Sequence, residues 1–426
     1  MDIHNQKLMR IFPRHLFLLL LVLCPWSFVH GPVFAAEYNI GTKILGEVKK
    51  NTQNQQLFPV DGYVNGSAYG SKISVETDMR FFRDFDTDND QYDLYQTVAH
   101  IQALEKLEFD LGRQFINQGF SVEILDGVQA TVTPTEHFFA TVFSGIPRDV
   151  EIENFSDNKE LLTGISLGLK NFKKTEATIH AAWVKNDVHV IEAGQNDEAL
   201  VGFTVSRQFA VSSTPFVYAN FEYNATGELV QVGTAGFDIY PTHRIALNLE
   251  GNYFNIDRDF AQPTIQGLYS TGRLIDARFS STWTLVEQYL KFTENVSYEN
   301  MEVLPQDFRN GWRIDTGFEL AIENAGFRFE PVYYYIKSFG GHVNGVRGYF
   351  HEQFNDLFYA ELSVDYSTYK KITNDNDYAI SLYGWTGYEV AKGLILSGGF
   401  EYNKNNLFDK DARAAFRIDY NFGKKS

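Results

Sequence analysis

The sequence repeats one pattern along almost its whole length: short segments in which apolar and polar residues alternate. The clearest copy covers residues 411–422. One set of alternate residues there is apolar or aromatic, namely Ala412, Ala414, Phe416, Ile418, Tyr420 and Phe422. The other set is Arg413, Ala415, Arg417, Asp419 and Asn421. Successive side chains of a β-strand point to opposite faces. This segment is therefore predicted to be a strand with one apolar face and one largely charged face.

Similar segments recur from about residue 38 to residue 422, among them 72–81, 161–170, 244–253, 312–322 and 358–366. After residue 35 no apolar run approaches the roughly 18 residues that a membrane-spanning helix needs. Repeated alternation is typical of a transmembrane β-barrel, in which the apolar face meets lipid and the polar face lines an aqueous lumen. The sequence thus predicts an all-β protein with one antiparallel up-and-down barrel domain over residues 36–426.

The connectors between these segments alternate between short and long. Short connectors are 69–71, 104–106, 133–135, 323–326 and 390–393, and longer ones are 84–91, 117–125, 146–158, 186–198 and 257–267. The spacing predicts about 22 strands, with 20 as the alternative, because such barrels have even strand numbers. The first strand-like run begins at residue 38, so no plug domain is expected. Residues 117–125 and 146–158 are the loops that we expect to narrow the lumen.

Residues 1–35 have the features of a signal peptide. Lys7, Arg10 and Arg14 form a basic start, residues 16–23 are apolar, and Val33 and Ala35 occupy the small-residue positions before a cleavage site. This segment predicts that the chain is exported across the inner membrane and that the barrel then inserts into a different membrane.

Composition excludes several kinds of function. The only cysteine is Cys24, so the predicted mature chain has no disulfide, no thiolate metal site and no haem attachment of its own. Without residues 1–35 the chain keeps 34 of its 37 basic and 53 of its 54 acidic residues, a net charge of −19. Such a chain is not expected to bind nucleic acid.

The polar faces of the predicted strands carry both acidic and basic residues. The predicted pore-lining residues are Glu76, Asp78, Arg80, Glu108, Asp110, Arg244, Glu250, Arg313, Asp315, Glu319, Glu361, Asp365, Arg413, Arg417 and Asp419. In a wet channel these charges set the ion preference. The alternative is that carboxylates and arginines pair across strands and only stiffen the barrel.

One acidic segment suggests a metal site. Asp86, Asp88 and Asp90 alternate along the chain and offer oxygen ligands to a calcium ion. Gln91 and Thr97 stand where an EF-type loop needs Gly and Glu, so a solvated acidic loop is the competing interpretation. No other cofactor is predicted. The histidines lack metal or triad spacing and no catalytic motif is present, so an enzyme is not expected.

The last strand resembles the closing strand of bacterial outer-membrane β-barrels, which ends in an aromatic residue. Phe422 matches that aromatic, with Tyr420 before it, although residues 423–426 follow where the family usually ends. A second, shorter resemblance to porin families is carried by residues 112–114 and 125–128. The resemblance implies a porin-like protein in the outer membrane of a Gram-negative bacterium. It also implies that lipid surrounds the barrel and that barrel-assembly machinery reads Tyr420 and Phe422.

Two functions fit these features. The first is a porin for small polar solutes or ions, mildly cation-selective because of the acidic excess. The second is a barrel that encloses a partner, such as a periplasmic or extracellular multihaem cytochrome that carries electrons across the membrane. A wide barrel without a plug suits both.

Overall fold

The computed structural model describes residues 37–50, 56–85, 89–118, 121–148, 159–186, 197–211, 213–255, 273–304, 307–338, 341–371, 376–405 and 411–424. The predicted signal peptide lies outside the described residues, as do Asp86 and Asp88 and residues 149–158 of one predicted constricting loop. No helix among the described residues is long and apolar enough to cross a membrane.

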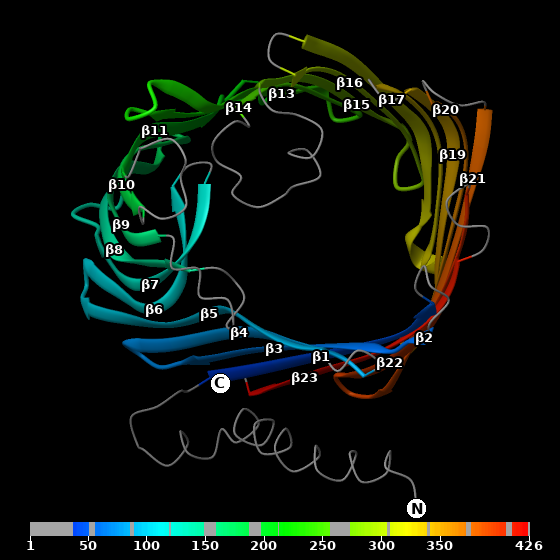
Figure 1. Ribbon diagram of the computed structural model, residues 1–426, viewed down its shortest axis with the longest axis horizontal. Helices are drawn as coiled ribbons and strands as arrows, with labels where there is room; N and C mark the ends of the chain where they lie inside the picture. The colour runs from blue at the N-terminus through cyan, green and yellow to red at the C-terminus, as the bar shows by residue number, and fades with distance from the viewer. Residues whose placement is uncertain are drawn as a thin grey trace, which may run out of the picture.

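The described chain is almost entirely β-strand, in a single sheet that closes on itself (Figure 1). The first strands are β1 (Glu37–Lys50), β2 (Gln56–Leu57), β3 (Pro59–Tyr69), β4 (Ile73–Asp84), β5 (Asn89–Leu104), β6 (Leu107–Gln118), β7 (Ser121–Val132) and β8 (Phe138–Arg148). They are followed by β9 (Lys159–Phe172), β10 (Thr175–Asn186), β11 (Asp197–Gln208), β12 (Phe216–Asn224), β13 (Leu229–Thr242), β14 (Ile245–Asn255), β15 (Arg273–Val286) and β16 (Leu290–Leu304). The last elements are β17 (Asp307–Ile322), the 3-10 turn η2 (Glu323–Ala325), β18 (Phe327–Ser338), β19 (Gly341–Asn355), β20 (Phe358–Lys371), β21 (Asn376–Ala391), β22 (Leu394–Lys404) and β23 (Asp411–Lys424).

Twenty-two of these strands form the barrel wall. The short strand β2 pairs only with the end of β1, where Lys49 faces Leu57, and so extends the β1–β3 hairpin. Every other strand pairs antiparallel with its neighbours in the chain, and β1 pairs with β23 from Tyr38↔Lys424 to Val48↔Ala414. The predicted barrel of about 22 strands is confirmed, the alternative of 20 is wrong, and no plug domain is evident in the described part of the chain.

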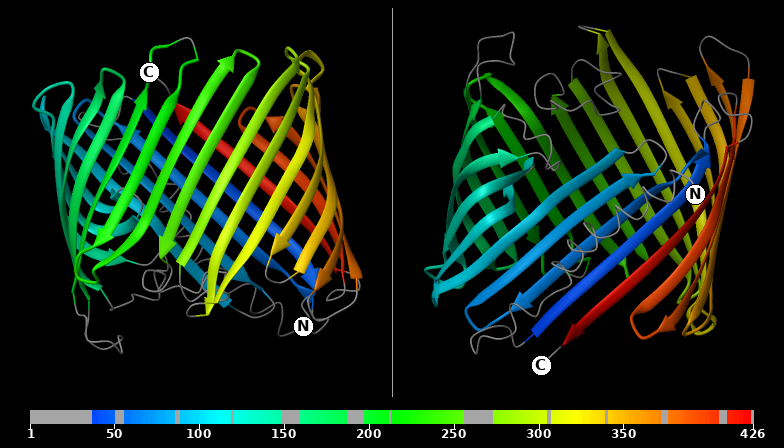
Figure 2. Two further views of the ribbon diagram at one scale, coloured as in Figure 1. Left: turned by 90° about the horizontal axis from the view of Figure 1, so that it is seen from above. Right: turned by 60° about the horizontal axis from the view of Figure 1, so that its bottom comes forward.

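Tight turns join the strands at one end of the barrel. Backbone hydrogen bonds tie each turn to the next part of the rim, such as Gln102 N to Lys72 O at 2.8 Å and Thr133 N to Lys106 O at 3.0 Å. Figure 2 shows the strands crossing the wall obliquely. Because the wall has an even number of strands, β1 begins and β23 ends at this same end, which we call the short-turn end.

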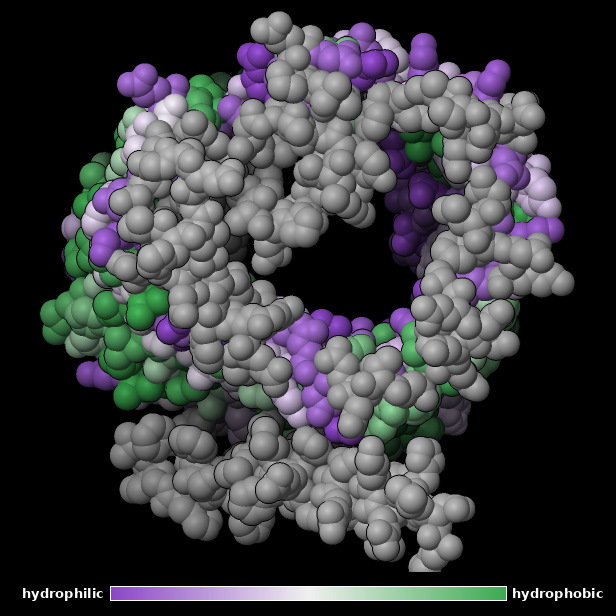
Figure 3. All heavy atoms as spheres, viewed as in Figure 1, coloured by the Kyte–Doolittle hydropathy of each residue, from purple (hydrophilic) through white to green (hydrophobic). Residues whose placement is uncertain are grey.

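The two faces of the wall differ as the alternation predicted. Large apolar side chains remain exposed on the outer face, including Ile179 at 64% and Leu249 at 56% relative exposure. Exposed apolar surface of this extent on a closed single-layer wall requires a nonaqueous surrounding. Figure 3 shows hydrophobic residues gathered along the left outer edge and hydrophilic residues beside the central opening.

The far end of the β6–β7 hairpin departs from the wall. Figure 1 shows this end, in cyan, inside the ring formed by the other strands. Ile116 and Leu125, from the two strands of the hairpin, form one buried apolar cluster with Phe143, Leu162, Ala182 and Val184 of β8, β9 and β10. Gly112 precedes the bend with φ 119°, a conformation that a side chain disfavours. The hairpin therefore docks on the inner wall and reduces the open width of the lumen on that side.

Candidate functional site: the inner wall of the barrel

The structure places the predicted pore-lining residues on the face opposite the exposed apolar side chains, with one exception. Arg244 lies in the turn between β13 and β14, at the short-turn end. There it pairs with Glu287 of the β15–β16 turn at 3.1 Å. Hydrogen bonds from Arg244 and His243 hold the pKa of the Glu287 carboxyl below its usual value. Arg244 is thus a rim residue, because β14 begins only at the next residue, Ile245.

Many inward-facing arginines are paired with a carboxylate on the same strand. The shared spacing is two residues, which puts both side chains on one face. Nitrogen–oxygen distances are 2.6 Å for Arg278–Asp276, 2.6 Å for Arg313–Asp315, 2.6 Å for Arg417–Asp419, 2.8 Å for Arg413–Asp411 and 2.9 Å for Arg309–Asp307, and Arg328 pairs with Glu330 in the same way. Each of these units is neutral by itself.

Arg80 pairs across strands instead. Its Nη2 lies 2.6 Å from Asp61 of β3, and its Nη1 lies 3.3 Å from Asp93 of β5. Glu319 likewise faces two cations, Lys291 of β16 at 3.3 Å and Arg328 of β18 at 3.9 Å. Cross-strand pairing, the structural alternative raised by the sequence, thus accounts for part of the inner wall.

Other inward carboxylates have polar neutral partners and no Arg or Lys within 4 Å among the described residues. Tyr hydroxyls donate to them: Tyr69 to Glu76 at 3.0 Å, Tyr218 to Glu250 at 2.5 Å and Tyr334 to Asp365 at 2.6 Å. Glu361 faces His351 at 3.4 Å. The nearest arginines stand one strand away, Arg278 opposite Glu250 and Arg347 opposite Asp365, and neither forms an ion pair with that carboxylate. These carboxylates thus lack the close counter-charge that the arginine-paired ones have.

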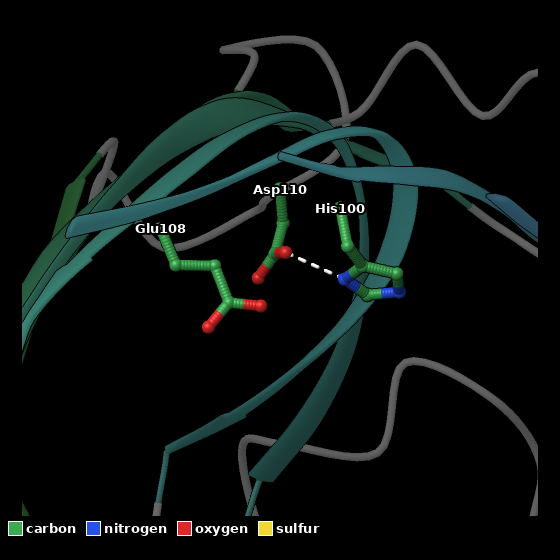
Figure 4. Close-up of side chains that lie close together, drawn as sticks. All are labelled: His100, Glu108 and Asp110. Carbon is green, nitrogen blue, oxygen red and sulfur yellow. Dashed lines mark hydrogen bonds and ion pairs between the residues drawn. The ribbon is translucent and has the colours of Figure 1, made fainter. Parts of the chain in front are cut away.

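One imidazole is surrounded by such carboxylates. His100 of β5 faces Asp110 of β6 across the strand pair, with Nδ1 and Oδ1 2.6 Å apart. Glu108 lies two residues before Asp110 on the same face, and one ligand atom from each of the three residues lies within 4.8 Å of the others. Figure 4 shows the Glu108 carboxylate turned toward this pair. The group adjoins a hollow of about 320 Å³ at the short-turn end.

Two groups of polar contacts on the inner wall were not predicted from the sequence. His180 of β10 and Glu222 of β12 are both buried, and their Nε2 and Oε2 atoms are 3.6 Å apart. They approach across Gly202 of β11, where a Cβ would lie 2.4 Å from His180 Nε2. In the second group the guanidinium of Arg417 lies 5.4 Å from the Trp385 ring centre and donates to the Tyr359 hydroxyl at 3.3 Å. Only tertiary contact joins these residues, which are distant in sequence.

Arg113 is a charged residue on the outward, apolar side of the β6 alternation. It shares the parity of outward Leu111, yet it is only 7% exposed. Its guanidinium donates to both Asp126 oxygens at 2.7 and 2.8 Å and to the Leu94 carbonyl at 3.1 Å. Arg148 of β8 donates to the same carboxylate at 3.2 Å. The charge at an apolar position is thus compensated beside the bend of the β6–β7 hairpin.

The predicted calcium residues are only partly described. Asp90 belongs to β5, and its Oδ2 lies 3.0 Å from Arg83 Nη1 of β4. One of its oxygens is thus paired with a guanidinium. Asp86 and Asp88 lie outside the described residues, so calcium binding there stays a prediction.

The predicted assembly residues lie on the outer face at the closing seam. Phe422 and Tyr420 are 47% and 42% exposed. The Phe422 ring lies 5.8 Å from that of Tyr38 on β1. The strand continues past Phe422, because Gly423 pairs with Asn39 and Lys424 with Tyr38. The terminal aromatic therefore sits within the seam ladder and not at its end.

Sequence comparison finds no relative: no protein-family model matches, and neither does any curated protein. Solved structures do match. A variant of the ferric enterobactin receptor PfeA from Pseudomonas aeruginosa has a TM-score of 0.59 and 9% identity over 91% of this chain and 81% of that chain. The translocation pore of the P pilus usher PapC has a TM-score of 0.50 and 8% identity over 91% of this chain and 100% of that chain. Acinetobacter baumannii OccAB4 has a TM-score of 0.45 and 8% identity over 92% and 99% of the two chains, too low to assign a shared fold.

At these identities the likeness concerns the fold alone. The closed antiparallel wall, its apolar exterior and its charged interior together define a β-barrel of the transmembrane type.

Proposed function

We propose that this protein is an outer-membrane channel of a Gram-negative bacterium that passes small polar solutes or ions with a mild preference for cations. The closed wall supports the location, because a barrel satisfies every backbone hydrogen bond internally and shows lipid only its apolar face. The polar inner wall supports an aqueous path.

The observation that carries the cation preference is the unequal pairing of charges on the inner wall. Many inward arginines have a carboxylate within 4 Å, whereas Glu76, Glu250 and Asp365 bond to tyrosine hydroxyls. Unpaired carboxylates attract cations and repel anions along a narrow aqueous path. The Debye length at physiological salt is about 8 Å, so the preference in a wide bore is mild.

Reversal potentials in planar bilayers across a KCl gradient test this proposal. We expect a potential of the sign for K⁺ preference that shrinks as total salt rises. Neutralising three carboxylates together, Glu76→Gln, Glu250→Gln and Asp365→Asn, is expected to reduce it. The matched control is the double variant Asp307→Asn with Arg309→Gln, which removes one charge of each sign and is expected to leave it unchanged. Anion preference in the unmodified protein would contradict the proposal.

A barrel that encloses a partner, such as a multihaem cytochrome, is the second candidate. No plug is present among the described strands, and Figure 3 shows a central opening. Both features leave space in the lumen for a partner. A reconstituted barrel that never conducts, although it is folded and inserted, would favour this candidate. Co-purification of a haem protein from the native membrane would then identify the partner.

A further inference from the structure

Three carboxylates of the inner wall converge on one imidazole near the short-turn end. His100 lies on β5, Glu76 on β4, and Glu108 and Asp110 on β6. The register places His100 opposite Asp110, and places the neighbouring residue pair Gln102↔Glu108 on the same face. Three adjacent strands thus supply one nitrogen ligand and several oxygen ligands at a single level of the wall.

The contacts around the ring are directional. Nδ1 of His100 lies 2.6 Å from Asp110 Oδ1, and Nε2 lies 4.0 Å from Glu76 Oε2. Glu108 completes the group on the Nδ1 side, as Figure 4 shows. One ring nitrogen therefore faces two carboxylates while the other nitrogen faces a third. Histidines that ligate a metal through one nitrogen usually donate the other N–H to a carboxylate, the part that Glu76 would have here.

Neutral donors also hold two of these carboxylates, and they bond to the oxygens that do not face the imidazole. Gln129 of β7 donates to Asp110 Oδ2 at 2.9 Å, and Tyr69 of β3 donates to Glu76 Oε1 at 3.0 Å. Outer partners of this type orient metal ligands. Glu108 has no hydrogen bond or ion pair within the described part of the chain, so its side chain is free to rotate toward an ion.

No fixed positive charge neutralises this group. Among the described residues, no lysine or arginine lies within 4 Å of Glu76, Glu108 or Asp110, in contrast to the arginine-paired carboxylates of β15, β17 and β23. Lys106, which borders the adjoining hollow, directs its ammonium to the Pro134 carbonyl at 2.7 Å. Lys72 borders the same hollow and makes no ion pair with these carboxylates. A cation is the group that this cluster lacks.

We propose that His100 Nδ1, Asp110 and Glu108 bind one divalent transition-metal cation of the Zn²⁺ class, with Glu76 accepting from His100 Nε2. Imidazole favours Zn²⁺, Co²⁺ and Ni²⁺, whereas Mg²⁺ and Ca²⁺ prefer sites made of oxygen alone. Zinc binds nitrogen and carboxylate oxygen at about 2.0–2.2 Å, so ligand atoms now within 4.8 Å need only a modest side-chain rotation. The site does not depend on whether the barrel conducts.

Calorimetric titration of the folded barrel with Zn²⁺ and with Mg²⁺ tests the site. The protein must carry no polyhistidine tag, because such a tag binds Zn²⁺ itself. The test variants are His100→Ala, Glu108→Gln and Asp110→Asn. The matched control is His351→Ala, because His351 of β19 also faces a carboxylate, Glu361 of β20, on the inner wall but at 3.4 Å and without the surrounding trio. Heat-modifiable migration identifies any variant that fails to fold.

We expect one Zn²⁺ per barrel, weaker binding of Mg²⁺, and at least a roughly tenfold loss of Zn²⁺ affinity in each test variant that folds. The His351→Ala barrel is expected to bind as the unmodified protein does. Three results would overturn the site: no Zn²⁺ binding below about 1 mM, unchanged affinity in His100→Ala, or Mg²⁺ bound as tightly as Zn²⁺. The last result would mean a diffuse acidic surface that attracts any divalent ion.

Discussion

The carboxylates around His100 on β4–β6 and those of β15, β17 and β23 lie on the same inner wall but have different partners. Over β15, β17 and β23, each of Asp276, Asp315 and Asp419 has an arginine two residues away at 2.6 Å. Over β4–β6, Glu108 and Asp110 occupy the same two-residue spacing, and the neighbouring strand supplies a histidine. A spacing of two puts like charges together as readily as opposite ones. Spacing together with residue type therefore decides which carboxylates have an arginine partner and which do not.

The largest effect is expected from converting one region into the other. Glu108→Arg places a guanidinium two residues from Asp110, the arrangement found at Arg313 and Asp315. It removes one proposed ligand and supplies the counter-charge that the cluster lacks. Zn²⁺ binding is expected to disappear, and K⁺ preference is expected to fall. Titration and reversal potentials measure both. If Glu108→Arg binds Zn²⁺ like Glu108→Gln, the added counter-charge has no influence and the comparison fails.

Removing the arginine of an arginine–carboxylate pair is expected to lower the free energy of unfolding, and more so where the carboxylate is buried. Asp276 is only 2% exposed, so Arg278→Gln leaves a buried carboxylate with Asn252 as its remaining partner at 2.8 Å. We expect a loss of about 1–3 kcal/mol in the free energy of unfolding. Arg309→Gln is the control, because Arg309 and Asp307 are 52% and 40% exposed. Its cost is expected to be about 0–1 kcal/mol. Urea unfolding of detergent-folded barrels measures both, and equal losses would show that burial does not separate the two units.

A substitution on the outer face is expected to have the smallest effect on either inner region. Phe422→Ala removes an exposed ring at the seam that packs near Tyr38. We propose that this ring is part of the assembly signal, so the amount of folded barrel is expected to fall in cells. The barrels that do fold are expected to keep their ion preference and Zn²⁺ affinity. Heat-modifiable migration measures the yield. An unchanged yield would mean that the residues after Phe422 displace the signal, and altered Zn²⁺ binding would mean that the two faces are coupled.

The sequence by itself determined the class of fold and the face of nearly every charged residue. Alternation with a period of two is a local property of strands, so Arg313, Glu361 and Asp419 are assigned to the inner face without knowledge of their neighbours. Arg244 was wrongly placed inside a strand, because alternation does not mark where β14 begins. The spacing of the segments and the even strand number of such barrels left 22 or 20 strands, and the structure has 22.

Tertiary structure alone decided which charges meet. His100 faces Asp110 because of the β5–β6 register, and His180 reaches Glu222 across Gly202, a contact that spans three strands. A shift of register by two residues would keep every side chain on its face and change every partner. The bend of the β6–β7 hairpin depends in the same way on Gly112 and on the apolar cluster of Ile116 and Leu125 with β8–β10. Pairing is a non-local property, so the alternation that reveals the barrel carries no information about it.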